Sequence, residues 1–332
     1  LKQTGIQGPV ADDARYHLAG LYLQNRRALT DDQRIEWVWG VRYTYARAEA
    51  DRVQDPITGR PFRIEEDWDA VVGSLRGLAR LGSEGQSAIY AGVSQGFRAP
   101  NLSDLSRLDI ARSNEFEVPT RDLDPEYYTS YEIGFRLAGA PVTLEAAAYH
   151  TAIDGMIVRT PTGRTLEGGL AEVAKRNAGD GYIRGAEARL DLALARDWTL
   201  WGQTMWMEGE VDGYPDSSPH KVREPVSRLM PLTFRAGLQW AAPHQRAWVE
   251  VAGEAAEKAD RLSAADRRDT QRIPPGGTPG YAVCHLRAGA RVTSNLRLTA
   301  ALENLFDADY RIHGSGVNEP GRNLVLTADW RF

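Results

Sequence analysis

The feature that most constrains this chain is an alternation of apolar and polar residues that recurs from one end to the other. At the C-terminus, Leu324, Leu326, Ala328, Trp330 and Phe332 fall on one face of an extended segment, and mostly polar residues fall on the other. A period of two residues is the signature of a β-strand with one apolar face. The pattern predicts thirteen strands, near 14–28, 36–48, 69–81, 87–98, 127–138, 142–160, 182–195, 198–212, 228–242, 246–262, 280–292, 296–306 and 323–332. Residues 170–176 fit either a short helix or the beginning of the strand at 182–195.

The connections between these segments alternate in length. Long links at 49–68, 99–126, 161–181, 213–227, 263–279 and 307–322 alternate with short ones at 29–35, 82–86, 139–141, 196–197, 243–245 and 293–295. Antiparallel strands place alternate connections at opposite ends, so every long link is expected at one rim of the sheet. Many segments have about 10 to 15 residues, which exceeds the usual strand of globular proteins and suits a tilted strand that crosses a bilayer. The pattern therefore predicts an all-β, antiparallel transmembrane β-barrel with short periplasmic turns and long extracellular loops.

Composition supports this reading and excludes others. The chain has 332 residues, of which 26% are charged, and no stretch reaches the roughly 18 uncharged apolar residues of a spanning helix. A polar strand face is tolerated when it lines a wet lumen. The net charge of −5 gives no reason to expect nucleic acid as a partner. The single cysteine, Cys284, excludes an internal disulfide framework and a Cys-rich zinc site.

The tryptophans cluster along the chain beside the short links. Because indole rings prefer the boundary between lipid and water, the sequence predicts an aromatic membrane girdle at the short-turn rim. Its expected members are Trp37, Trp39, Trp198, Trp201, Trp240, Trp248, Trp330 and Phe332. The alternative is that these are core tryptophans of a soluble all-β protein, which would not be expected to gather at one rim.

Several motifs resemble those of TonB-dependent outer-membrane receptors. They are Gly-Phe-Arg-Ala-Pro at 96–100, Tyr-Glu-Ile-Gly at 131–134, Arg-Asn-Ala-Gly at 176–179 and Glu-Asn-Leu-Phe-Asp at 303–307. Their order and spacing agree with that family from about residue 36 to Phe332. The resemblance implies a 22-stranded barrel around an N-terminal plug. Residues 1–332 are then expected to be one partial barrel domain, a fragment without the plug and the early strands.

The resemblance also implies a location and partners. The family lies in the outer membrane of Gram-negative bacteria as multi-pass barrels, in contact with outer-membrane lipid. The missing plug would contact TonB, and the terminal Phe332 would be recognised by the barrel-assembly machinery. The implied function is active import of an iron complex, either a ferric siderophore or haem, bound first at the long extracellular loops. No cofactor is expected.

Candidate ligand-binding residues are those of the motif and the loops: Phe97, Arg98, Pro100, Arg112, Arg121, Arg268, Arg311, His313 and Arg322. Residues 101–122 contain no histidine, and the Leu-Asp-Pro-Glu at 123–126 departs from the second haem-receptor motif, so both count against classical haem ligation. His313 is either an iron ligand or an ordinary loop histidine.

Other functional classes remain as alternatives. A passive porin or a structural barrel would need no plug, and the family also imports cobalamin and glycans. An enzyme is not expected, because the sequence lacks a Gly-x-Ser-x-Gly motif and clusters of metal ligands.

Overall fold

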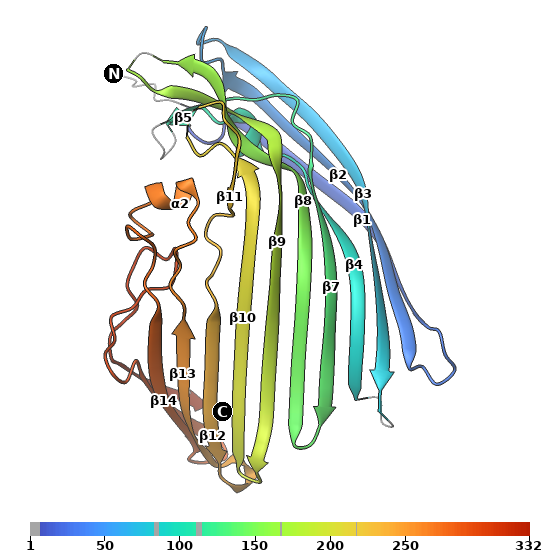
Figure 1. The fold of residues 1–332 in the computed structure, drawn as a ribbon, viewed down its shortest axis with the longest axis vertical. Coiled ribbons are helices and arrows are strands. Elements are labelled where there is room, and N and C mark those ends of the chain that lie inside the picture. Colours follow the sequence, from blue (N-terminus) through green and yellow to red (C-terminus); the bar gives the residue numbers. More distant parts are fainter. Residues whose placement is uncertain (1–6, 83–85, 111–114, 167, 217) are drawn as a thin grey trace.

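The computed structural model describes residues 7–82, 86–110, 115–166, 168–216 and 218–332. These residues form one large curved β-sheet (Figure 1). The continuous antiparallel path of the sheet consists of β1 (Asp12–Ala28), β2 (Ile35–Gln54), β3 (Pro61–Leu81), β4 (Ser87–Arg98), β7 (Glu126–Gly139), β8 (Val142–Thr165), β9 (Ala171–Ala195), β10 (Trp198–Gly213), β12 (Thr233–Ala241), β13 (Ala247–Ala256), β14 (Tyr281–Arg291), β15 (Leu296–Glu303) and β16 (Asn323–Trp330). Each strand of the path pairs with the next one along the chain, so the thirteen predicted strands and their order are confirmed.

The remaining elements are short and belong to the connections. They are β5 (Asp109–Ile110), β6 (Glu115–Val118), β11 (Val222–Pro225), the helices α1 (Leu102–Ser106) and α2 (Ala264–Arg268), and the 3₁₀ turn η1 (Pro243–Gln245). Among the described helices, none has the length and apolar character that a membrane crossing requires.

Two of the expected long loops are mostly strand, and this corrects the prediction. β2 and β3 leave only residues 55–60 between them, and β8 and β9 leave only 166–170. Residues 171–176 accordingly begin β9 and form no helix. The period of two does continue through these segments, but it is carried by alanines and charged residues, which are weak strand formers by themselves. Ala46, Ala48 and Ala50 illustrate this, since all three are buried on one face of β2.

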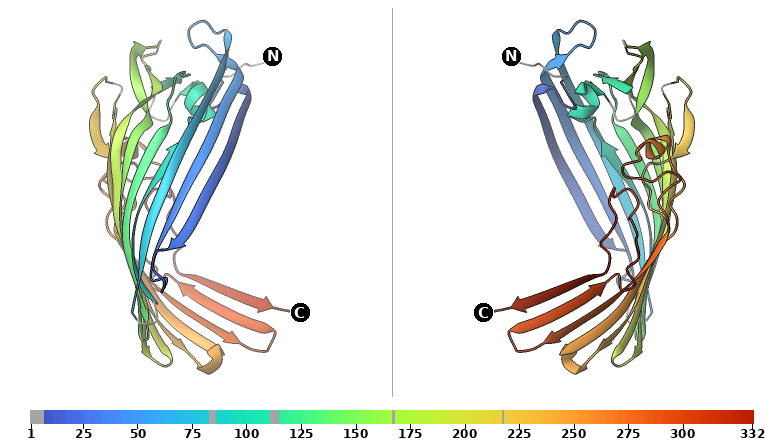
Figure 2. Two further views of the ribbon diagram at one scale, coloured as in Figure 1. Left: turned by 90° about the vertical axis from the view of Figure 1, so that its right-hand side faces the viewer. Right: turned by 90° about the vertical axis from the view of Figure 1, so that its left-hand side faces the viewer.

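The sheet is an open wall. It bends so that its two ends, β1 and β16, lie on the same side of the molecule (Figure 2). Within the described residues no pairing joins β1 to β16, so the barrel is not closed. The antiparallel, partial barrel expected from the sequence is therefore confirmed.

The inner and outer faces of the wall follow from the packing of the connection 99–125. The described residues of this segment lie against the concave face, where the Trp68 indole Nε1 donates a hydrogen bond of 2.7 Å to the Leu123 carbonyl. The strand register then places Glu132 and Arg136 of β7 on the inner face. The alternate residues Ile133 and Phe135 face outward and are 55% and 43% exposed. An apolar exterior and a polar interior are the reverse of a soluble barrel.

The aromatic residues divide between the two faces. Trp37, Trp39, Trp198, Trp240 and Trp330 have outward parity in the register. Phe332 lies two residues beyond the end of β16 and is fully exposed. Trp201 and Trp248 point inward instead: their rings cover Gly237 and Gly289, and the Trp201 indole donates a 3.0 Å hydrogen bond to Glu250. Their assignment to an outward girdle is thus corrected, because proximity to a short turn does not determine which face a residue takes.

A close approach between β9 and β10 yields a prediction for folding. A Cβ atom added at Gly181 would lie 2.2 Å from the Glu210 carbonyl oxygen, so backbone must move. Gly181→Ala is expected to cost about 1–3 kcal/mol and to lower the thermal unfolding midpoint of the intact protein, followed by the heat-dependent gel shift of the barrel. Gly77→Ala, which meets nothing within 4 Å, is the control and should leave the midpoint unchanged. Equal midpoints for the two variants would contradict the register.

Candidate functional site

The candidate site is the inner side of the rim that carries the long connections. The described parts of 99–125, 214–232, 257–280 and 304–322 belong to this rim, and the short turns lie at the opposite end of the strands (Figure 1). We call it the long-loop rim. Two groups of side chains organise it, one on each side of the concave wall.

The first group is held by Arg98 at the end of β4. Its Nε lies 2.7 Å from Glu126 Oε2 and its Nη1 lies 2.7 Å from Asp104 Oδ2. Glu126 is 2% exposed and also accepts a 2.7 Å hydrogen bond from the backbone N–H of Ile157. Asp104 and Asn101 cap α1 reciprocally. Arg98 therefore joins the beginning of the 99–125 connection to β7 at its end.

The other motif residues have packing roles. Pro100 is fully buried, and Phe97 packs against the apolar cluster that contains Leu105 and Leu123. The Phe97 ring lies 5.9 Å from the ring of Tyr127. Phe97, Arg98 and Pro100 therefore hold the 99–125 connection against the wall, and their contacts are with protein.

The same group contains a second ionic cluster, which the sequence did not predict. Glu117 of β6 is fully buried, and its carboxylate lies 2.6 Å from Arg159 Nε, 3.5 Å from Arg107 Nε and 3.9 Å from Lys175 Nζ. We call these four residues the Glu117 cluster. Burial lowers the pKa of Lys175, although the Glu117 carboxylate opposes that shift. Three cations surround one carboxylate here, and a further carboxylate, Asp109, lies 3.2 Å from Arg107.

The Glu117 cluster depends on a pairing that no local pattern encodes. β6 joins β9 in parallel, with Glu117 opposite Val173, and this brings the 99–125 connection over β8 and β9. Parity along the 142–160 strand could have placed Arg159 on the inner face. The partner of Arg159 could not have been found in this way, because Glu117 lies in a different loop.

The second group lies around α2. Asp269 lies 2.7 Å from Arg228 Nη2 and 2.9 Å from Arg272 Nη1. Nearby, His313 is 9% exposed, and its Nδ1 lies 2.9 Å from the Thr278 hydroxyl. Burial lowers the pKa of His313. The ring is therefore enclosed by protein, and its Nδ1 is already engaged.

The remaining predicted residues are dispersed along the rim. The Arg121 guanidinium lies 4.5 Å from the ring centroid of Phe62, and Arg268 donates to the Pro215 carbonyl. Arg311 Nε donates to Asn318 at 2.8 Å, and Arg322 Nε donates to the Leu305 carbonyl at 3.0 Å. Arg112 lies outside the described residues. The predicted residues thus do not converge on one point.

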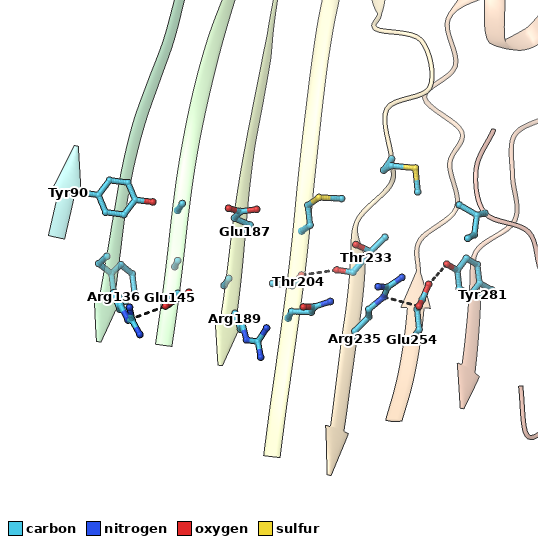
Figure 3. A pocket seen from close by; sticks show the side chains of 18 residues that line it. Tyr90, Arg136, Glu145, Glu187, Arg189, Thr204, Thr233, Arg235, Glu254 and Tyr281 are labelled. Atoms are coloured by element: carbon cyan, nitrogen blue, oxygen red, sulfur yellow. Dashed lines mark hydrogen bonds and ion pairs between the residues drawn. The ribbon is translucent and has the colours of Figure 1, made fainter. Parts of the chain in front are cut away.

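Below the rim the inner wall is lined by paired charges. A cavity of about 610 Å³ there is bordered by Arg136 and Glu145, which lie 3.1 Å apart, and by Arg235 and Glu254, which lie 2.8 Å apart (Figure 3). The Tyr281 hydroxyl donates to Glu254 at 2.6 Å. In the described part of the chain, no group of three histidine, cysteine or acidic side chains is arranged to hold a metal ion. The inner wall is therefore a polar surface whose charges largely neutralise one another.

Fold and site together define a class. An open antiparallel wall with an apolar exterior, a polar interior and long connections at one rim is the architecture of outer-membrane β-barrels. The family model described as "TonB dependent receptor-like, beta-barrel" matches residues 3–305, and the chain belongs to this family.

A curated relative is an iron-regulated outer membrane virulence protein of Vibrio cholerae. It is 24% identical over 263 residues, which are 74% of this chain and 37% of the relative. The match therefore covers well under half the length of that relative.

Solved structures show the same fold. A copper transporter, OprC, superimposes with a TM-score of 0.76 at 19% identity, over 98% of this chain and 50% of that one. The haemophore receptor HasR of Serratia marcescens, in complex with its haemophore HasA and haem, gives 0.74 at 18% identity, over 100% and 53%. The ferric-catecholate import receptor Fiu of Escherichia coli K12 gives 0.67 at 18% identity, over 96% and 45%.

The Arg98–Glu126 pair predicts how the 99–125 connection is held. Arg98→Ala leaves the buried Glu126 carboxylate without its cationic partner, which is costly. We expect the connection to be cleaved by proteinase K at least about fivefold faster in the intact protein. Asp124→Ala, which removes an exposed carboxylate from the same connection, should change the rate less than twofold. Equal cleavage rates for both variants would contradict a fastening role for Arg98.

The buried His313 predicts a pH dependence of its loop. Its folded-state pKa lies below the unfolded value of about 6.5, so its stabilising effect is complete above that value and is lost as the pH falls below it. Hydrogen exchange within 304–322, corrected for intrinsic rates, should show less protection at pH 5 than at pH 7.5. In His313→Gln this difference should disappear, and a persistent difference would assign it to another group.

Proposed function

We propose that this chain forms much of the wall and the extracellular loops of a TonB-dependent receptor that imports an anionic iron complex across the outer membrane of a Gram-negative bacterium. In this proposal TonB acts through an N-terminal plug, as in the family, and the barrel-assembly machinery recognises Phe332. The inner wall of paired charges would face the plug. The observation that supports an anionic ligand is the excess of cations in the Glu117 cluster.

The electrostatics of that cluster favour an anion. Arg107, Arg159 and Lys175 converge on one side of the long-loop rim and outnumber the two carboxylates that pair with them, Glu117 and Asp109, by one. Asp104 also acts on the Lys175 charge, and it pairs with Arg98. Partial burial weakens screening by water and salt, so the excess charge attracts an anionic chelate more strongly than an exposed side chain would. Arg159, at 38% side-chain exposure, is the most accessible of the three cations.

Of the two kinds of iron complex considered, ferric siderophore and haem, the site favours a ferric siderophore. His313 is enclosed by protein at 9% exposure, and residues 101–122 contain no histidine, so these loops offer little for axial ligation of haem. Relatives are named for iron regulation, ferric-catecholate import, haemophore reception and copper transport. These names support metal-complex import as the general class and leave the choice of ligand to the site.

The proposal is tested with the full-length gene in a strain that lacks its own uptake systems. Iron-55 uptake is measured from a panel of ferric siderophores and from haem, with and without TonB. We expect uptake from at least one siderophore and its loss without TonB. Uptake that persists without TonB would indicate a passive barrel, and uptake from haem alone would overturn the siderophore assignment.

The residue assignment has its own measurement. Arg159→Gln combined with Lys175→Gln should weaken binding of the imported complex to whole cells at least about tenfold, since two charge-assisted contacts are lost. Arg63→Gln is the matched control: it removes an arginine from the outward face of β3, where it pairs with Asp51 and Glu65. Binding that is equal in both variants would exclude the Glu117 cluster from ligand contact.

A further inference from the structure

The outward face of β8, β9 and β10 changes abruptly from apolar to charged. Above the outward-facing Trp198, residues of outward parity on β9 and β10 are uncharged up to Ala186 and Trp206, and apart from Gly202 and Thr204 they are apolar or aromatic. The next outward positions are Arg184 and Glu208, which face each other in the register. A tilted strand rises about 2.5 Å per residue along the barrel axis, so roughly ten residues span the apolar band of about 25 Å. Arg184 and Glu208 therefore lie at the upper edge of that band.

A network of cations occupies this edge. Arg184 Nε lies 2.6 Å from Glu208 Oε1, and Arg261 Nη1 lies 2.7 Å from Glu208 Oε2. Arg184 and Arg223 also lie 5.7 Å and 5.9 Å from the ring centroid of Tyr182. Lys221 completes the group, 3.9 Å from Asp212. We call Arg184, Lys221, Arg223 and Arg261 the outer basic cluster.

The cations of this network are more exposed than the acids that pair with them. Side-chain exposure is 53% for Arg184 and 54% for Arg261, but 16% for Glu208 and 35% for Glu210, which lies 3.4 Å from Arg261. Lys221 and Arg223, at 44% and 47%, likewise exceed Asp212 at 22%. The carboxylates thus lie beneath the cations, and the surface offered to the surroundings is positive.

At the corresponding height on β2 and β3, the outward face carries more acidic than basic side chains. On β2 and β3, Arg47 and Arg63 share the outward face with Glu49, Asp51 and Glu65. These acids are 17%, 47% and 42% exposed and outnumber the two arginines. A positive upper edge is therefore a local property of β8 to β10 and not a general feature of the barrel.

An apolar depression lies directly below the outer basic cluster. It has a volume of about 520 Å³, and alanines of β8 and β9 form its floor, between Phe135 on one side and Trp206 with Leu232 on the other. The floor residues are Ala146, Ala148, Ala186 and Ala188. Small side chains between bulky ones leave a furrow that a hydrocarbon chain can fill.

We propose that the outer basic cluster and this furrow together bind lipid A of the outer leaflet, with its phosphates on the arginines and an acyl chain over the alanines. Arginine recognises phosphate through paired charge-assisted hydrogen bonds, and the acyl chain buries apolar surface at the same time. The proposal rests on the outer-membrane location given under the proposed function. It does not depend on which complex is imported.

The test measures lipid A retained by the intact protein after extraction from outer membranes in mild detergent, by mass spectrometry per mole of protein. Arg184→Gln combined with Arg223→Gln should retain at least about tenfold less lipid A than the unaltered protein. Arg47→Gln combined with Arg63→Gln removes two outward arginines from β2 and β3 and should retain lipid A within about twofold. Equal retention in both double variants would overturn the proposal.

Two further measurements test whether the loss of lipid A reflects loss of phosphate recognition. Arg184→Lys combined with Arg223→Lys keeps both charges but loses the paired hydrogen bonds, so it should retain an intermediate amount of lipid A, more than the glutamine variant. This arm separates loss of charge from misfolding. The delipidated protein should rebind bisphosphorylated lipid A at least about fivefold more tightly than dephosphorylated lipid A. Equal binding of the two lipids, or preferential retention of phospholipid, would also overturn the proposal. Iron uptake is measured separately, so a failure of import leaves the lipid result interpretable.

Discussion

The constraint on which this structure depends is the need to pair every backbone N–H and C=O group in a medium that offers no water. In hydrocarbon, an unpaired peptide group costs several kcal/mol, so a strand must have a neighbour on both sides. The continuous ladder from β1 to β16 meets this need across the width of the wall. Long antiparallel strands, short turns at one rim and long connections at the other all follow from it.

The side chains then distribute according to the two environments that the wall separates. Outward positions carry the apolar band and most of the predicted girdle, whereas inward positions carry pairs such as Arg235 and Glu254. At the long-loop rim, strands that extend past the band give the 99–125 connection a surface on which to fold. Arg98 fastens that connection, and the Glu117 cluster is assembled beneath it. The ligand proposal and the lipid proposal thus concern opposite faces of the same strands β8 and β9.

Local periodicity was enough to predict the strands, their order and the two rims, because the alternation of faces is written into each segment separately. It was not enough for strand lengths, since Ala46, Ala48 and Ala50 continue β2 without a strong strand signal. It also assigned Trp201 and Trp248 to the wrong face, where counting parity within each strand would have separated Trp198 from Trp201. The motif residue Arg98 was found by resemblance, but its buried partners Asp104 and Glu126 depend on tertiary folding. The Glu117 cluster was missed for the same reason.

The central claim is that alternate residues of these strands face lipid and water in the membrane. It is tested most directly by a spin-label scan of β7 from Tyr131 to Leu137, one position at a time, in the intact protein with Cys284 replaced by serine. We expect a period of two, with odd positions accessible to oxygen dissolved in lipid and even positions accessible to a water-soluble nickel chelate. A profile without that alternation, or one with the two phases exchanged, would contradict it.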